Sequence, residues 1–193
     1  MPRITEKRQI LDFDSSWTAI KWDESGEFVG SMERALHQLN DGVKAADVIA
    51  VRDVRYRPKT LLLAEFKDYD HPNVPQQQQQ QTALAAVSSN LMQNIVRKII
   101  DTLSGVTFAH SSNDQRCDEL ASWRPALGQK STLLIVLLCI EVPPSQSIVA
   151  LAWTKELQRR LRWLGPNARV IVTNQNRPFQ GDGFTYRVVS ALT

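Results

Sequence analysis

The feature that most constrains this chain is an unbroken apolar run at residues 133–140, continued by Val142. A membrane-spanning helix needs about 20 apolar residues, so this run is too short to be one. A short apolar run between polar segments is typical of a strand that is buried on both faces. Residues 48–51 and 61–66 repeat the pattern on either side of a loop that contains Pro58, which predicts a hairpin. We therefore expect a sheet that is covered on both sides.

Segments with helical spacing separate these strands. Three segments carry apolar side chains every three or four residues and are expected to be helices: 29–40, 84–103 and 147–164. Gly105 is expected to mark the end of the second helix. Two more strands are expected, at 169–173 and 186–191. The order helix, hairpin, helix, strand, helix, strand, strand predicts a single α/β domain with a mixed sheet.

The remaining regions set the domain boundaries. Residues 1–28 are interpreted as an N-terminal extension with one or two short elements, followed by one domain over 29–193. The polar, irregular stretch at 107–130 predicts a surface insertion in that domain. Six glutamines at 76–81 fit either a flexible linker or the first turns of the next helix. The polar N-terminus has no apolar signal core, and we expect a cytoplasmic protein with no membrane association.

Composition narrows the class of function. The net charge of +3 and the pI of about 9.0 favour a polyanionic partner only weakly. Cys117 and Cys139 make no ligand-spaced cluster with the three histidines, so a structural zinc site is not expected. Two lone cysteines also do not resemble a secreted disulfide scaffold, which favours a reducing compartment.

Charged residues stand at the ends of the two hairpin strands. Glu65 and Lys67 are two apart, so their side chains share one face, while Phe66 points the other way into the core. Asp47 opens the preceding strand, and antiparallel pairing brings it across from Glu65. Crowded carboxylates repel unless a cation lies between them, and hard oxygen ligands suit Mg²⁺. The pattern predicts a metal site at one sheet edge.

Asp47, a hairpin-length gap and then Glu65-Phe66-Lys67 resembles the PD-(D/E)xK superfamily of nucleases. The resemblance covers roughly residues 29–175, including the order of the helices and strands. The family usually has Pro before the Asp, where this chain has Ala46. The resemblance implies a restriction endonuclease-like α/β fold, in which a mixed central sheet is flanked by helices. It also implies an acidic residue in the first helix, a place that Glu33 matches.

The resemblance further implies a mechanism. Asp47 and Glu65, with the Phe66 carbonyl, would hold one or two Mg²⁺ ions, for which Mn²⁺ can substitute. Lys67 would position or help to deprotonate the attacking water. Glu33 would add to the acidic set. The reaction is phosphodiester hydrolysis in nucleic acid, with DNA expected as the substrate and RNA as the alternative, in a setting such as phage defence or DNA processing.

Simpler interpretations of the same residues stay open. Asp47, Glu65 and Lys67 could form a structural ion pair at a strand end, and Glu33 could be a solvated helix residue. Asp68 and Asp70 fit a role in capping the loop after the strand better than a role as ligands. The alternative function is a catalytically silent nuclease-fold subunit that binds nucleic acid or a protein partner.

A basic stripe supplies a candidate surface for nucleic acid. Lys155, Arg159 and Arg162 lie opposite the apolar face of the helix expected at 147–164, where they could contact phosphates. An ordinary solvated helix face has the same pattern. No separate DNA-reading motif is recognised in the sequence. We therefore expect either cleavage with little sequence specificity or reliance on a partner, such as a second copy in a homodimer or a targeting protein subunit.

Overall fold

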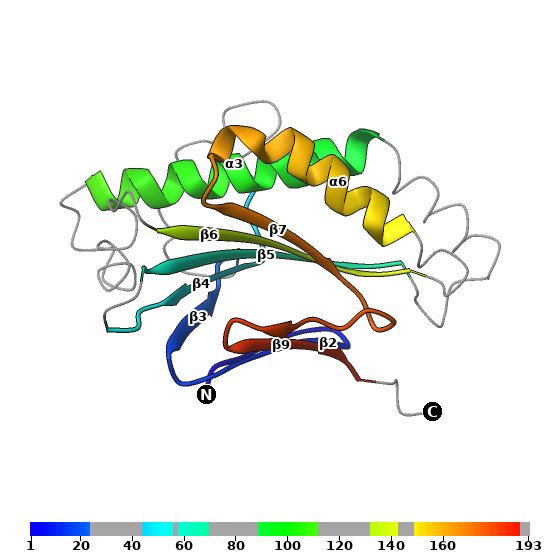
Figure 1. Ribbon diagram of the computed structural model, residues 1–193, viewed down its shortest axis with the longest axis horizontal. Coiled ribbons are helices and arrows are strands. Elements are labelled where there is room, and N and C mark those ends of the chain that lie inside the picture. The colour runs from blue at the N-terminus through cyan, green and yellow to red at the C-terminus, as the bar shows by residue number, and fades with distance from the viewer. Residues whose placement is uncertain (24–43, 56–57, 70–88, 112–131, 143–148, 190–193) are drawn as a thin grey trace.

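The computed structural model describes residues 1–23, 44–55, 58–69, 89–111, 132–142 and 149–189. These residues build three layers (Figure 1). Two α-helices lie on one face of a five-stranded sheet, and a four-stranded sheet lies on its other face. The predictions that concern residues 29–40, including Glu33, and the glutamines at 76–81 fall outside the described residues.

The five-stranded sheet has the order β3-β4-β5-β6-β7. Its strands are β3 (Trp17–Lys21), β4 (Val48–Arg52), β5 (Thr60–Asp68), β6 (Leu133–Glu141) and β7 (Ala168–Thr173). β3, β4 and β5 pair antiparallel, whereas β5, β6 and β7 pair parallel. The expected mixed α/β sheet and its antiparallel hairpin are confirmed.

The second sheet was not expected. It has the order β1-β2-β9-β8, with β1 (Arg3–Glu6), β2 (Gln9–Phe13), β8 (Gln180–Gly181) and β9 (Phe184–Val188). The prediction of one or two short elements near the N-terminus is wrong, because three strands lie within residues 3–21. The strand expected at 186–191 begins at Phe184 and joins this second sheet.

Aromatic packing explains why the two ends of the chain come together. The ring of Trp17 lies 5.6 Å from that of Phe13 and 5.8 Å from that of Phe184, measured between centroids. All three side chains are buried. Burial of such large side chains strongly stabilises the contact between distant segments. Periodicity within one segment carries no information about such a partner.

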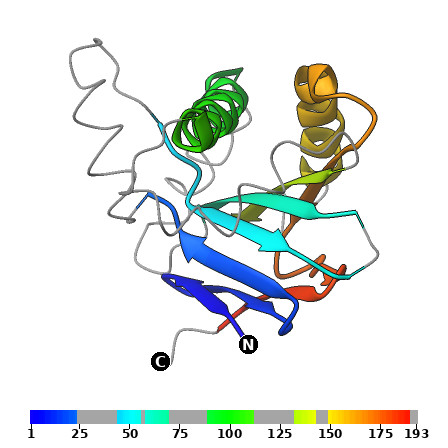
Figure 2. The same ribbon diagram turned by 90° about the vertical axis from the view of Figure 1, so that its left-hand side faces the viewer.

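Two helices cover the opposite face of the five-stranded sheet (Figure 2). They are α3 (Ser89–Ser111) and α6 (Val149–Leu161), and a short 3-10 helix, η4 (Arg162–Leu164), follows α6. Helices were expected to flank the sheet, but both described helices lie on one side and the second sheet covers the other. Neither α3 nor α6 is long and apolar enough to cross a membrane.

α3 also corrects the boundaries expected from the sequence. It continues through Gly105, where an end was expected, so residues 107–111 are helical and not part of a surface insertion. A glycine inside a helix costs about 1 kcal/mol relative to alanine. Val106 is completely buried against the sheet, and this packing offsets that cost. Residues 112–130 of the expected insertion fall outside the described residues.

The side chains of β5 separate into two cores. Leu61 and Leu63 pack in the cluster beneath α3 and α6, whereas Leu62 and Ala64 pack in the cluster against the second sheet. The expectation that both faces of this strand are covered is confirmed. Because side chains alternate along a strand, Glu65 and Lys67 share the helix side with Leu63.

Candidate active site

α3 fixes the path by which the chain enters β4. The backbone N–H of Ala46 donates to Thr102 Oγ1 at 2.8 Å, and the N–H of Lys44 donates to Asp101 Oδ2 at 3.0 Å. Ala46 is completely buried, so an unpaired N–H there would be costly. Side chains from one stretch of α3 therefore hold the segment that leads to Asp47.

Asp47 lies beside Glu65, as the sequence predicted. Val48 is opposite Ala64 in the β4–β5 register, which places Asp47 next to Glu65 at the end of the ladder. Asp47 Oδ2 accepts the backbone N–H of Phe66 at 2.7 Å. In a β-sheet, the N–H and C=O of one residue point toward the same neighbouring strand. The Phe66 carbonyl therefore points to the same side of β5 as Asp47.

Two lysines neutralise the acid pair. Lys67 Nζ lies 2.5 Å from Glu65 Oε1. Lys98 Nζ lies 3.1 Å from Asp47 Oδ1, and 2.7 and 3.0 Å from the two oxygens of Glu65. Lys98 belongs to α3, so the site combines the hairpin with a helix. The structure thus brings Asp47, Glu65 and Lys67 together and adds Lys98.

Lys98 is the site residue that the sequence analysis missed. The signal that could have found it is its place on α3, since Ile95 and Ile99 are buried and Lys98 borders their apolar stripe. A lysine at the margin of a buried stripe must direct its ammonium to water or to an acid.

Burial governs the electrostatics of the pair. Only 1% of the Glu65 side chain is exposed. Burial and the neighbouring Asp47 charge raise the pKa of Glu65, and the two lysines offset this rise only in part. Burial lowers the pKa of Lys98, but the Glu65 and Asp47 charges outweigh it, so the pKa is raised overall. Burial and Glu65 also raise the pKa of the neighbouring Tyr69.

A second acid pair occupies the opposite face of the same strand ends. Asp68 and Glu141 are register partners on β5 and β6 and face the second sheet. Arg8 holds Asp68 through two hydrogen bonds of 2.9 Å, from Nε and Nη2. Asp68 therefore pairs with the turn between β1 and β2, a contact that the interpretation as a loop cap did not include. Asp70 lies outside the described residues.

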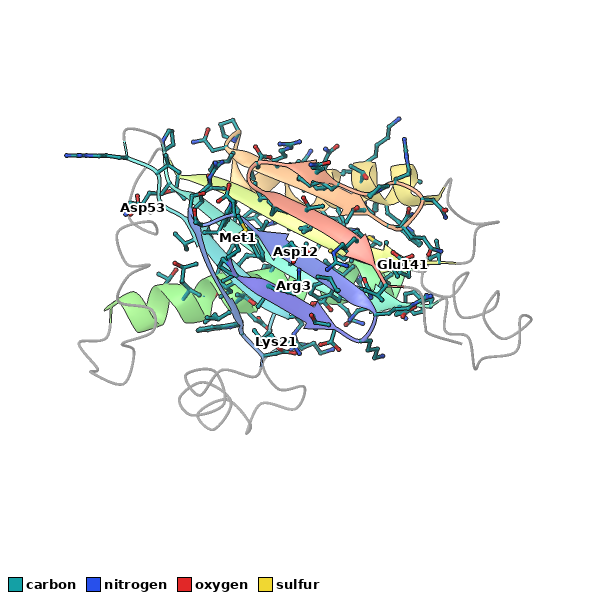
Figure 3. All side chains as sticks on the ribbon, turned by 90° about the horizontal axis from the view of Figure 1, so that it is seen from below. Met1, Arg3, Asp12, Lys21, Asp53 and Glu141 are labelled. Atoms are coloured by element: carbon teal, nitrogen blue, oxygen red, sulfur yellow. The ribbon has the colours of Figure 1, made fainter. Side chains whose placement is uncertain are left out.

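Glu141 lies in a buried hydrogen-bond network. It is completely buried, and its Oε1 accepts the Tyr186 hydroxyl at 2.5 Å and the Gln175 N–H at 2.9 Å. The Tyr186 hydroxyl also lies 3.0 Å from Gln9 Oε1. Burial raises the pKa of Glu141 although Tyr186 and Gln175 stabilise the anion. Figure 3 places Glu141 at one end of the sheets and Asp53 at the other.

The donor set on the helix side fits a hard divalent cation. Carboxylate oxygens of Asp47 and Glu65 lie around one common position, which Lys98 Nζ occupies. Mg²⁺ is commonly bound by one or two carboxylates and several waters. In the part of the chain that the structure describes, no group of three or more His, Cys, Asp or Glu side chains is placed to hold a metal. The candidate protein ligands are the carboxylates of Asp47 and Glu65, with the Phe66 carbonyl beside them.

The expected basic stripe spans α6 and the first residue of η4, and an acidic residue, Glu156, lies within it. Lys155, Arg159 and Arg162 are all exposed. Glu156 accepts two hydrogen bonds from Arg159, at 2.9 and 2.8 Å, and one from Arg160 at 2.6 Å. These contacts lower the pKa of Glu156 to about 2. Its negative charge offsets part of the positive charge of the stripe.

Comparison with known proteins adds nothing to this picture. No protein-family model, no curated protein and no solved structure matches the chain. The functional argument therefore rests on the residues of the site and their geometry. Those residues are the acid pair, its two lysines and the backbone of Phe66.

Proposed function

We propose that this protein is a metal-dependent nuclease of the PD-(D/E)xK type, which hydrolyses phosphodiester bonds in nucleic acid, with DNA preferred over RNA. The observation that carries the proposal is the convergence of Asp47, Glu65 and Lys67 at one sheet edge. The antiparallel β4–β5 hairpin beside the parallel strands β6 and β7 is compatible with a restriction endonuclease-like fold. Phage defence or DNA processing is the setting that we infer.

Each residue has a role in this reaction. Asp47, Glu65 and the Phe66 carbonyl would hold Mg²⁺ or Mn²⁺. Such an ion lowers the pKa of a bound water and stabilises negative charge on the phosphate. Lys67 lies beside Glu65 and supplies an ammonium. This group can orient the attacking water and neutralise negative charge on the pentacoordinate phosphorus of the transition state. Burial of Glu65 keeps bulk water from one side of the site.

A second candidate is a catalytically silent subunit with the same fold. One observation favours it, because Lys67 and Lys98 balance the two acids without any metal. Under this interpretation the four side chains form a structural ion-pair network. Such a protein would bind nucleic acid or a protein partner and cleave nothing.

Cleavage assays separate the two candidates. The whole chain is incubated with plasmid, linear duplex, single-stranded DNA and RNA, each with Mg²⁺, Mn²⁺, Ca²⁺ or EDTA. We expect cleavage with Mg²⁺ and Mn²⁺, and suppression with Ca²⁺, whose looser coordination positions water poorly. The matched control is Asp47→Asn, which preserves the acceptor for the Phe66 N–H and should be inactive. Absence of cleavage on every substrate, or full activity in Asp47→Asn, would refute the proposed function.

A further inference from the structure

The ammonium of Lys98 is hydrogen-bonded to the carboxylate oxygens that would bind a metal. Asp47 Oδ2 is engaged by the Phe66 N–H, which leaves Oδ1 to face the centre of the site. Asp47 Oδ1 and both oxygens of Glu65 lie within 3.1 Å of Lys98 Nζ. A bound Mg²⁺ needs oxygens at about 2.1 Å. One ammonium and one divalent cation cannot share the same three oxygens.

Lys98 can leave these oxygens without unfolding its helix. Its side chain is 22% exposed and reaches the site from the border of the apolar stripe of α3. A lysine ammonium is a point charge on a flexible four-carbon stem, so it can exchange one acceptor for another. Next to a metal-loaded acid pair, the strongest acceptor that a nuclease substrate offers is a phosphate oxygen.

We propose that Lys98 is an exchangeable counter-ion. Before metal binds, its ammonium pairs with Asp47 and Glu65 and holds them together. After metal binds, the ammonium forms an ion pair with a substrate phosphate instead. The inference rests on the proposed function, because it assumes that the acid pair binds a divalent cation. Lys67 differs from Lys98 because, among the residues that the structure describes, its ion pair is with Glu65 and does not include Asp47. Lys98 thereby couples metal binding to the binding of nucleic acid.

The coupling predicts opposite effects on two affinities. Lys98→Met removes the competing charge, so Mn²⁺ alone should bind on the order of tenfold more tightly than to the wild type. With Ca²⁺ present to prevent cleavage, the same variant should bind duplex DNA more weakly. Its log-affinity should depend on log-salt with a slope smaller by about one unit. A residue with a purely structural role would not change the two affinities in opposite directions.

Isothermal titration of Mn²⁺ and binding of duplex DNA at several salt concentrations test the inference. Lys98→Arg keeps the charge and should bind Mn²⁺ no more tightly than the wild type. Lys59→Met is the matched control, because Lys59 pairs with Asp53 at the opposite end of β5 and should change neither affinity. If Lys98→Met does not fold, Lys98→Gln takes its place and the same changes are expected.

The outcomes distinguish this inference from the function on which it rests. Mn²⁺ binding that depends on Asp47 but does not tighten in Lys98→Met or Lys98→Gln would overturn the role of Lys98 and leave the proposed function intact. An unchanged salt slope would also overturn it. Absence of Mn²⁺ binding in the wild type and in every Lys98 variant would overturn both.

Discussion

The two faces of β5 carry two acid pairs at the same end of the strand. On the helix side, Asp47 and Glu65 are held by lysines. On the side of the second sheet, Asp68 is held by Arg8, and Glu141 is held by Tyr186. Both pairs place two carboxylates on neighbouring segments within one sheet. Their counter-groups, and not the acids themselves, distinguish them.

The difference shows which pair can exchange its partner for a cation. A guanidinium grips a carboxylate through two parallel hydrogen bonds in a fixed plane, whereas an ammonium on a flexible stem does not. Arg8 and Asp68 are fixed in this way, and only 3% of the Asp68 side chain is exposed. The side chain of Asp47 is 15% exposed beside two partly exposed lysines. We therefore propose metal chemistry for the helix side and a structural role for the other side.

The largest effect is expected from the helix side. Glu65→Gln keeps the size of the side chain and removes its charge, so it should abolish metal-dependent cleavage. Loss of even an outer partner of a metal ligand typically costs about 10-fold to 100-fold, and loss of a direct ligand should cost more. Cleavage rates and circular dichroism should show an inactive, folded variant. Full activity would remove Glu65 from the site.

Breaking the opposite pair should affect stability instead. Asp68→Asn leaves Arg8 facing a neutral amide and should lower the free energy of unfolding by about 3 kcal/mol, as for other buried pairs that lose one partner. Urea denaturation measures this change, and cleavage per folded molecule should stay near the wild-type value. If cleavage disappears while the variant is folded, the division between the two faces is wrong.

A smaller loss of stability is expected at the tyrosine. Tyr186→Phe removes the hydroxyl that donates to Glu141 and contacts Gln9. Loss of one buried hydrogen-bond partner costs about 1–3 kcal/mol. Thermal denaturation should show a lower Tm than the wild type. An unchanged Tm would mean that this network does not help to hold the two sheets together.

The smallest effect depends on pH. Burial raises the folded-state pKa of Glu141 above the value of about 4.3 in an unfolded chain. The folded protein therefore binds the proton more tightly, and the stability from this group is lost as pH rises through the folded pKa. Glu141→Gln cannot ionise, so it should gain stability relative to the wild type at pH 8 compared with pH 4. Urea denaturation at both pH values would contradict this if the difference between the proteins were constant.

The helix-side pair could be predicted from sequence because its residues are close along the chain. Asp47 and Glu65 belong to one hairpin, and the alternation of β5 fixes which side chains share a face. Lys98 could not be predicted in the same way. It comes from a helix whose rotation about its axis is set by tertiary packing.

The second sheet could not be predicted for a similar reason. Arg8 and Asp68 are 60 residues apart, and Tyr186 and Gln9 are 177 residues apart. Neither pair has a local pattern that indicates its partner. The boundary of α3 was also wrong, because packing of Val106 outweighs the local preference of Gly105. Local periodicity predicted the strands β4 to β7 and the two helices α3 and α6, and contacts between distant segments determined the layers.

Titration with Mn²⁺, followed by electron paramagnetic resonance of the free ion, directly distinguishes which of the two acid pairs binds metal. The wild type, Asp47→Asn and Asp68→Asn are titrated under the same conditions, each confirmed as folded by circular dichroism. We expect Mn²⁺ to bind the wild type and Asp68→Asn alike, and binding to be lost in Asp47→Asn. Retained binding in Asp47→Asn, or loss of binding in folded Asp68→Asn, would contradict it.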